Sequence, residues 1–182
     1  MMFQHSRFIH VRRTMKEDIE FIYNMERENE NVQFIVPWSK EQHEASLADE
    51  DILHFIIEDK ESHRCVGYMI LAGLQSPNDS VELVRIVIGP KGKGYGKEAF
   101  RLIKNWVFHH QKANRLWLDV KVHNTRAIHL YKTQGFTIEG TLRECLKGTE
   151  GYESLHIMSL LRHEYLEAHF DSTPQCKSRL LE

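Results

Sequence analysis

Three glycines alternate with larger residues in the segment Lys91-Gly92-Lys93-Gly94-Tyr95-Gly96-Lys97. An apolar run that ends at Ile88 precedes this segment, and an amphipathic run that begins at Ala99 follows it. The pattern predicts a strand, a glycine-rich turn and the start of a helix. Glycine lets the backbone approach a ligand closely, and the first turn of a helix presents unpaired N–H groups with partial positive charge. The segment is therefore a candidate cradle for a pyrophosphate or similar anion.

The spacing of these glycines excludes two common nucleotide-binding motifs. The alternation of Gly92, Gly94 and Gly96 is not the Gly-x-Gly-x-x-Gly of dinucleotide-binding folds. No Gly-x4-Gly-Lys-Ser/Thr is present either, because Gly94 follows Lys93. A lysine-rich surface turn would show the same glycines, so a second motif has to decide between the two interpretations.

A second candidate motif lies in residues 116–136. Residues 116–122 alternate between apolar and polar side chains, as in a strand with one buried face. Asn124 or Thr125 would then cap a short helix that ends near Gly135, a residue suited to a left-handed helix end. This segment therefore adds a second strand and a second helix after the glycine segment.

Together the two segments resemble the GNAT superfamily of acyl-CoA-dependent N-acetyltransferases. The phosphate loop of that family reads Arg/Gln-x-x-Gly-x-Gly/Ala, and residues 91–96 fit it with lysine in place of the usual first residue. The second signature, Asn-x-x-Ala-x-x-Leu-Tyr-x-x-x-Gly-Phe, matches residues 124–136 throughout. The resemblance extends over residues 8–162. It implies an α/β (α+β) fold with a mixed, mostly antiparallel central sheet, helices on both faces, and acetyl-CoA as co-substrate.

The resemblance also assigns residues to the binding of acetyl-CoA. They come from the end of the strand before the glycine loop, from the loop itself and from the second signature. A backbone N–H on the strand 84–88, such as that of Val87 or Ile88, is expected to polarise the acetyl carbonyl. The full set is Ile86, Val87, Ile88, Lys91, Gly92, Lys93, Gly94, Tyr95, Gly96, Lys97, Asn124, Ala127 and Tyr131.

Acetyl transfer to an amine needs a base that takes the amine proton and an acid that protonates the departing thiolate. Similar enzymes use a tyrosine at the Leu-Tyr position of the second signature, so Tyr131 is the candidate acid; the other interpretation is an aromatic ring packed on Phe136. Asp119 lies where related enzymes carry a catalytic Glu, although it could instead pair with Lys121. Glu82 lies on the strand before the glycine loop. Both carboxylates are candidate bases.

We expect the acceptor amine to bind between two connections of the chain, which shape the acceptor pocket in relatives. One is the loop that contains Phe34 and Trp38, and the other is the hairpin near residues 143–153; Trp38 could equally pack beneath its loop. The end of the chain resembles the branch that acetylates serine or alanine N-termini of ribosomal proteins, together with relatives that acetylate polyamines. The expected acceptor is a protein N-terminus, a polyamine or another small cationic amine. A non-catalytic acyl-CoA-binding sensor or assembly module is the alternative from another functional class.

Charge is distributed unevenly along the chain. The net charge of the 182 residues is −2, yet residues 17–61 hold fourteen acidic and three basic side chains. Such a segment would attract a cationic acceptor, although two helices with solvated acidic faces give the same count. A nucleic-acid partner is not expected, because the overall charge is slightly negative and no aromatic platform accompanies the lysines.

Length and composition predict one acetyltransferase domain, residues 1–165, followed by a flexible C-terminal tail, residues 166–182. No apolar run is long enough to span a membrane and the N-terminus lacks the apolar stretch of a signal peptide, so we expect a cytoplasmic protein with no membrane partner. The cysteines form no Cys-x-x-Cys pair and no His-Glu-x-x-His is present, so no metal is expected. The resemblance alone implies a possible homodimer joined at sheet edges.

Hydrophobic periodicity predicts the element order β α α β β β α β α β β. The first helix should begin at a capping box of Thr14 and Glu17, and the second at Ser39 with Gln42. The predicted strands are 8–12, 53–58, 65–72, 81–88, 116–122, 136–142 and 156–161, and the predicted helices are 15–27, 39–49, 96–111 and 125–133.

Overall fold

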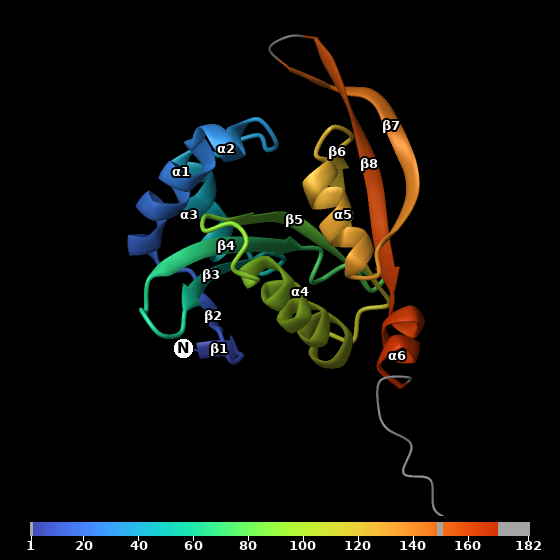
Figure 1. Cartoon of the computed structure of the whole chain (residues 1–182), viewed down its shortest axis with the longest axis horizontal. Helices are drawn as coiled ribbons and strands as arrows, with labels where there is room; N and C mark the ends of the chain where they lie inside the picture. Colours follow the sequence, from blue (N-terminus) through green and yellow to red (C-terminus); the bar gives the residue numbers. More distant parts are fainter. Residues whose placement is uncertain (1, 149–150, 171–182) are drawn as a thin grey trace, which may run out of the picture.

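The central feature of the fold is one mixed sheet, seen in a computed structural model that describes residues 2–148 and 151–170 (Figure 1). Over these residues eight strands follow the order β1-β2-β3-β4-β5-β6-β8-β7. Neighbouring strands are antiparallel except for β5 and β6, which run parallel. The mixed, mostly antiparallel sheet expected from the sequence is confirmed. The strands are β1 (Met2–His5), β2 (Ile9–Arg13), β3 (Leu53–Asp59), β4 (Cys65–Ala72), β5 (Ser80–Ile88), β6 (Arg115–Lys121), β7 (Thr137–Lys147) and β8 (Tyr152–Leu161).

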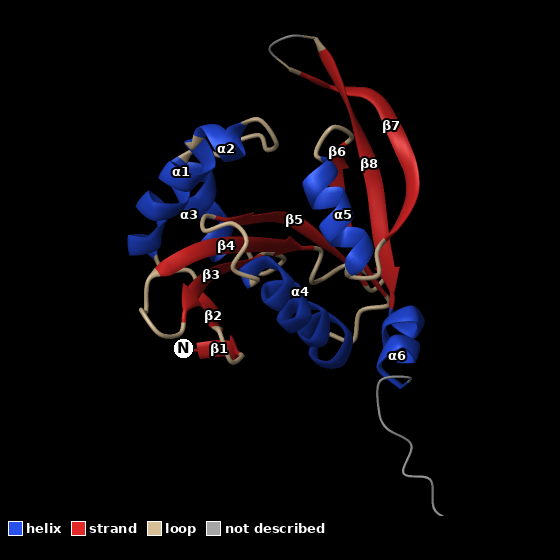
Figure 2. Cartoon of the chain, viewed as in Figure 1, coloured by secondary structure: helices blue, strands red, loops and turns tan. Residues whose placement is uncertain are grey.

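Five of the helices fall into two groups, α1 to α3 and α4 with α5, and Figure 2 shows the two groups apart from one another, with α6 following β8. A 3₁₀ turn, Lys16–Asp18, precedes α1, and a π-helical turn, Trp106–His110, continues α4. The predicted helix over 96–111 is therefore confirmed, with its last turn wound as a π-helix. The helices are α1 (Ile19–Arg27), α2 (Asn29–Val32), α3 (Lys40–Ala48), α4 (Tyr95–Asn105), α5 (Thr125–Thr133) and α6 (Arg162–Phe170).

The sheet separates two hydrophobic clusters. In one cluster, Phe100 of α4 packs together with Tyr131 of α5. In the other, Ile22 of α1 packs with Tyr68 of β4 and Val87 of β5. Because successive side chains of a strand point to opposite faces, the position of a residue along β5 decides which group of helices it meets.

The two parallel strands β5 and β6 separate soon after they meet. They pair only through Ser80, Val81 and Glu82, although β5 continues to Ile88. The β4–β5 register slips directly afterwards, because Leu71 lies opposite Leu83 but Ile70 lies opposite Arg85, which leaves Val84 as an extra residue. A bulge of this kind bends its strand and increases its twist. The fork between β5 and β6 is therefore placed by the bulge.

The expected capping box of Thr14 and Glu17 is wrong. Thr14 continues the pairing of β2 with β3, because its N–H donates to the carbonyl of His54 (2.9 Å) and its hydroxyl contacts Nδ1 of the same histidine (3.0 Å). The turn begins instead with the Met15 N–H donating to Oδ2 of Asp18 (2.8 Å). A tertiary partner forty residues away thus displaces a local cap that the sequence favours.

The two other predicted helix starts are confirmed. The Ser39 hydroxyl accepts from the Gln42 N–H (3.2 Å), and the Gln42 side chain accepts from the Ser39 N–H (2.8 Å), which is the reciprocal capping box. The Asn124 side chain accepts from the Ala127 N–H (3.2 Å) and caps α5. Gly135 ends that helix with φ +93°, as a left-handed helix end requires.

The C-terminal hairpin is longer than its sequence pattern predicts, and it projects from the body of the molecule (Figure 1). Most of β7 is exposed, so its residues lack the alternation by which a half-buried strand is recognised. Beyond it, α6 extends through the first residues of the segment expected to be a tail, and the ring of Tyr165 stacks on Phe108 with centroids 4.9 Å apart. The rest of the expected tail, 171–182, lies outside the described residues.

Candidate active site

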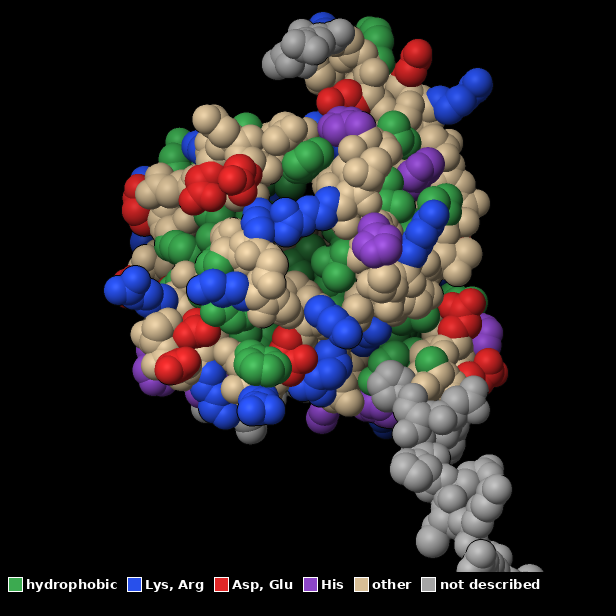
Figure 3. All heavy atoms as spheres, viewed as in Figure 1, with side chains coloured by type: hydrophobic (Ala, Val, Ile, Leu, Met, Phe, Trp, Pro, Cys, Tyr) green, Lys and Arg blue, Asp and Glu red, His purple; other side chains and the backbone are tan. Residues whose placement is uncertain are grey.

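A cavity of about 930 Å³ occupies the fork between β5 and β6. Figure 3 shows the hollow, with Lys and Arg side chains around its opening. Its walls come from β5, β6, the glycine segment, α5 and the loop after α2. All the site residues expected from the sequence line it except Lys93 and Trp38: Phe34, Glu82, Ile86, Val87, Ile88, Lys91, Gly92, Gly94, Tyr95, Gly96, Lys97, Asp119, Asn124, Ala127 and Tyr131.

The glycine segment has the geometry of an anion cradle. Gly92 and Gly94 adopt φ of +78° and +81°, a conformation that L-residues with side chains rarely adopt. A Cβ built on either glycine would meet no atom within 4 Å, so open space lies beside the backbone there. Gly94 is the N-cap of α4 and has no side chain to occupy the first-turn N–H groups. These groups are directed at the space where a phosphate would lie.

The lysines of the segment differ in what they contact. Lys91 turns back onto the protein, where its ammonium donates to the Ile88 carbonyl and to Oδ1 of Asn31 (3.2 Å). Burial and the neighbouring charge of Arg126 lower the pKa of Lys91. Lys97 and Arg126 also line the cavity. The positive charge and the open backbone fit the phosphates of acetyl-CoA.

The Tyr131 side chain both packs against other aromatic rings and lines the cavity, so both interpretations offered by the sequence remain compatible with its position. Its ring lies 5.4 Å from that of Phe100 and 6.1 Å from that of Phe136, centroid to centroid. The side chain is buried at 9% exposure yet still lines the cavity. Burial, and secondly the charge of Asp119, raise the pKa of its phenol. The hydroxyl therefore stays protonated and available as a proton donor.

Glu82 and Asp119 are the two carboxylates at the fork. They lie on neighbouring strands, where Glu82 pairs in register with Trp117, two residues before Asp119. Neither side chain has a hydrogen-bond or ion-pair partner in the described part of the chain. Burial raises the pKa of Glu82, and the charge of Asp119 raises it further. Burial also raises the pKa of Asp119, against an opposing effect of Arg85.

The backbone of β5 offers N–H groups to the cavity after the fork. Gly89 donates to the carbonyl of Val66 in β4 (2.9 Å). In an antiparallel pair, alternate residues direct their N–H groups to the partner strand. The N–H of Val87 is thus turned toward β4, and those of Ile86 and Ile88 toward the fork. Sequence analysis suggested the N–H of Val87 or Ile88 as the donor to the acetyl carbonyl. The N–H of Ile88 faces the fork, whereas that of Val87 does not.

Most carboxylates of the acidic segment 17–61 do not face the cavity. Asp18 pairs with Arg12 (2.6 Å), and Glu26 pairs with Arg85 (2.5 Å). Glu30 alone, among the carboxylates of this fully described segment, lines the cavity. The negative charge in the cavity therefore comes mainly from Glu82 and Asp119. The number of acidic residues in segment 17–61 overstates how much negative charge that segment contributes to the cavity.

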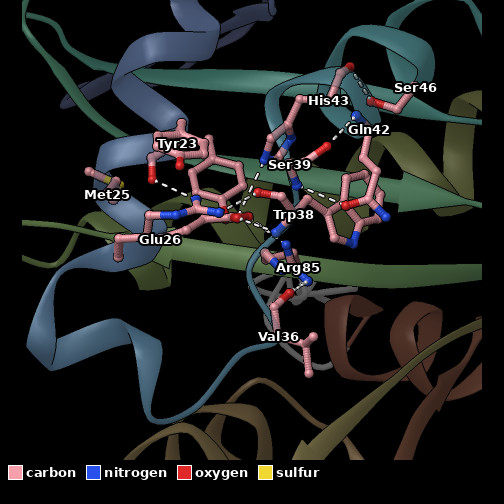
Figure 4. Close-up of polar contacts among 12 residues, drawn as sticks. Tyr23, Met25, Glu26, Val36, Trp38, Ser39, Gln42, His43, Ser46 and Arg85 are labelled. Atoms are coloured by element: carbon pink, nitrogen blue, oxygen red, sulfur yellow. Dashed lines mark hydrogen bonds and ion pairs between the residues drawn. The ribbon is translucent and has the colours of Figure 1, made fainter.

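Sequence analysis missed Arg85, which lines the cavity, and its ion-pair partner Glu26 (Figure 4). The Glu26 side chain is fully buried and accepts from Arg85, from the hydroxyl of Tyr68 (2.5 Å) and from the Trp38 N–H (2.7 Å). The Trp38 ring packs on His43, with centroids 5.3 Å apart. Trp38 therefore packs beneath its loop. The one available signal was an arginine within the otherwise apolar run 83–88.

Lys121 is a second cation beside the cavity that sequence analysis did not assign. Its ammonium donates to the Gln33 carbonyl (2.9 Å) and pairs with Glu153 of β8 (2.7 Å). It therefore does not pair with Asp119, which was the structural alternative for that carboxylate.

Two findings concern the described residues as a whole. They contain no group of three or more His, Cys, Asp and Glu side chains that could hold a metal ion. None of their helices is long and apolar enough to cross a membrane.

Spermidine N-acetyltransferases are among the known proteins that this chain resembles. The chain is 26% identical over 164 residues to spermidine N(1)-acetyltransferase of Escherichia coli K12, covering 85% of this chain and 86% of the relative. It is 27% identical over 161 residues to the enzyme of the same name from Vibrio cholerae, covering 82% and 90%.

Solved structures of Vibrio cholerae spermidine N-acetyltransferase share the fold. A chimeric form has a TM-score of 0.78 at 25% identity, covering 87% of this chain and 98% of the other. A form in complex with CoA and spermine has a TM-score of 0.78 at 24% identity, with the same coverage.

The profile of the Acetyltransferase (GNAT) family matches residues 19–136, more than half of the chain. This match includes the glycine segment, the fork and the whole second signature. The matched residues include the glycine segment, Tyr131, Glu82 and Asp119, all of which contribute to the lining of one cavity. The chain belongs to the acetyltransferase (GNAT) family and is an N-acetyltransferase with acetyl-CoA as its acyl donor.

Proposed function

We propose that this protein acetylates a primary amine of a polyamine or a similar small aliphatic amine. The observation that carries the proposal is the pair of unpaired carboxylates, Glu82 and Asp119, at the fork. An alkylammonium is a cation, and partly buried carboxylates without partners attract it. The relatives named spermidine N(1)-acetyltransferase support the same acceptor class. Family membership gives no support to a non-catalytic sensor.

Glu82 and Asp119 are proposed to take the amine proton. An alkylamine has a pKa of about 10.4 and is charged at neutral pH, so a proton must leave before attack. The raised pKa values of both carboxyls bring them closer to neutral pH, where a base works best. Because the charge of Asp119 raises the pKa of Glu82, Glu82 becomes the better proton acceptor once Asp119 is ionised.

The opposite wall of the cavity is proposed to hold the acyl donor. Acetyl-CoA supplies the activated thioester. The N–H groups at Gly92 and Gly94 and the first turn of α4 would bind its phosphates, and those of Ile86 and Ile88 would face its acetyl carbonyl. Tyr131 would give its proton to the departing sulfur. Burial raises the pKa of a thiol as it raises that of the phenol, so the two groups stay close enough for exchange.

We also propose that residues 1–165 form one acetyltransferase domain and that two copies associate through β7. Most side chains of this strand are exposed, and among the described strands only β8 pairs with it. A long unpaired edge favours pairing with another strand. Light scattering after size exclusion would give twice the mass of the chain. The cytoplasmic location expected from the sequence stays a prediction.

The direct test is acetyl-CoA turnover with two acceptor sets, followed by release of the CoA thiol. Spermidine, spermine and putrescine form one set, and short peptides that begin with Ser or Ala form the other. Thiol release with the polyamines and not with the peptides is expected. Release with the peptides alone would overturn the acceptor proposal and leave family membership intact.

A further inference from the structure

Residues 33–38, which we call the acceptor strap, cross the fork between β5 and β6. Four strap residues line the cavity: Gln33, Phe34, Ile35 and Val36. The strap contacts the β6 side at one end and the β5 side at the other. It therefore spans the cavity between the two strands, in a region where they no longer pair.

A buried lysine anchors the strap on the β6 side. Lys121 donates to the main-chain carbonyl of Gln33 (2.9 Å), and Glu153 balances its charge (2.7 Å). The Lys121 side chain is only 10% exposed, so this contact is shielded from competing water. The ring of Phe34 adds a contact with the ring of His123, with centroids 5.7 Å apart.

A buried arginine anchors the strap on the β5 side (Figure 4). Nη2 of Arg85 donates to the carbonyl of Val36 (2.7 Å), while Nη1 binds Glu26. The second oxygen of Glu26 accepts the N–H of Trp38 (2.7 Å). The ion pair therefore holds the main chain on both sides of Pro37.

These anchors determine what the strap offers to an acceptor. Two of its carbonyls, those of Gln33 and Val36, are already bound to cations. Its cavity-lining side chains Phe34 and Ile35 are apolar. A methylene chain needs no hydrogen bonds from such a wall, whereas each peptide amide that finds no hydrogen-bond partner there costs free energy.

We propose that Lys121 and Arg85 are specificity-determining positioning residues, which hold the acceptor strap so that the cavity accepts an unbranched alkylamine and rejects a branched amine or a peptide N-terminus. This inference rests on the proposed function, since it concerns the acceptor of the same site. Neither residue takes part in proton transfer, and each carries a carboxylate partner that cancels its charge toward the acceptor.

The test compares acceptors in the full-length enzyme and in Lys121→Met, which keeps the length of the side chain and removes its ammonium. The measured quantity is the ratio of kcat/KM for putrescine to kcat/KM for its α-methyl-branched analogue. The ratio is expected to fall about tenfold in Lys121→Met through a higher KM for putrescine and a lower KM for the analogue, with KM for acetyl-CoA unchanged. Lys121→Arg, which keeps the donor and the charge, should restore most of the ratio.

Lys112→Met is the matched control. It removes an exposed lysine from the connection between the π-helical turn and β6, away from the cavity, where the described residues provide no ion-pair partner for it, and it should leave the ratio at the wild-type value. If Lys121→Met does not fold, Phe34→Ala provides a second variant, because it opens the strap without leaving a charge unpaired. It should lower the ratio in the same direction.

The outcomes separate the two proposals. An unchanged ratio in Lys121→Met, or an equal loss of kcat for both amines, overturns the role of the strap. A wild-type enzyme that acetylates both amines equally well also overturns it, yet leaves the polyamine proposal standing. A wild-type enzyme that prefers the peptides overturns both.

Discussion

Nη1 of Arg85 lies 2.5 Å from Oε1 of Glu26, in an ion pair whose carboxylate has no solvent exposure. The pair joins α1 to β5 across one face of the sheet. It also reaches the loop after α2, because Arg85 and Glu26 each bind main-chain groups there. A contact that holds the fold together thus also shapes the acceptor side of the cavity.

Glu26→Gln is expected to destabilise the protein by about 3–5 kcal/mol, because it leaves the Arg85 guanidinium buried without a counter-charge. Urea denaturation at pH 7 gives the difference directly. Glu61→Gln, at an exposed position, should change stability by less than about 0.5 kcal/mol. Equal stabilities of the two variants would contradict a structural role for the pair.

The Glu26 carboxyl is also expected to make the free energy of unfolding depend on pH. Burial raises the pKa of Glu26, but the neighbouring His43 ring, whose Nε2 lies 3.4 Å from Oε2, and the charge of Arg85 outweigh that effect and lower the pKa below its ordinary range. A depressed pKa in the folded state means that the stabilisation is complete above the unfolded pKa of about 4.3 and is lost as pH falls below it. The difference between wild type and Glu26→Gln should therefore shrink between pH 5 and the lowered pKa of Glu26. A constant difference over this window would assign the stabilisation to another group.

Tyr131→Phe is expected to lower kcat by about 10²–10³-fold, because it removes the proposed proton donor. Its ring contacts with Phe100 and Phe136 remain, so the melting temperature should change little. Acetyl-CoA affinity, measured by calorimetry, should stay near the wild-type value. A variant that retains full turnover would show that Tyr131 serves in packing alone.

Asp119→Asn is expected to move the acidic limb of the pH profile of kcat/KM to lower pH. A base must be deprotonated to act, so activity rises with pH through the raised pKa of Glu82. Removing the Asp119 charge takes away one of the two causes of that raised pKa. A limb that stays in place would mean that Glu82 is not the titrating base.

Glu82→Gln should lose kcat with polyamines more strongly than Asp119→Asn if Glu82 is the main proton acceptor. The double variant should cost less than the product of the two single effects, because the carboxylates act as one unit. Steady-state rates at saturating acetyl-CoA measure all three. Independent, multiplicative losses would argue for separate roles.

Gly94→Ala is expected to raise KM for acetyl-CoA about tenfold or more. Its φ of +81° costs an alanine about 1–2 kcal/mol, and the new methyl group would enter the open space beside the backbone. Gly140→Ala is the matched control, because a Cβ there also meets nothing within 4 Å, but its φ is not positive. Equal KM values for the two variants would argue against the cradle.

Most of the order of elements, and the parts of the site that lie close together in sequence, could be predicted from the chain alone, whereas β1, α2 and α6 were not predicted. The cap at Asn124 and the left-handed turn at Gly135 depend on contacts within three or four residues. The glycine loop needs only its own backbone freedom and the helix that follows it. Such features follow from residue type and spacing, because the chain cannot place near neighbours far apart.

The acceptor side was decided only by tertiary structure. Lys121 and Gln33 are 88 positions apart, and Arg85 and Val36 are 49 apart. They meet because β5 and β6 stop pairing after Glu82, next to the bulge at Val84, and the loop after α2 lies between the two strands there. The same long-range packing took Thr14 away from its predicted cap. Sequence alone identified the segments that we propose bind phosphates and transfer protons, whereas sheet register and burial determined which charged side chains line the proposed acceptor side.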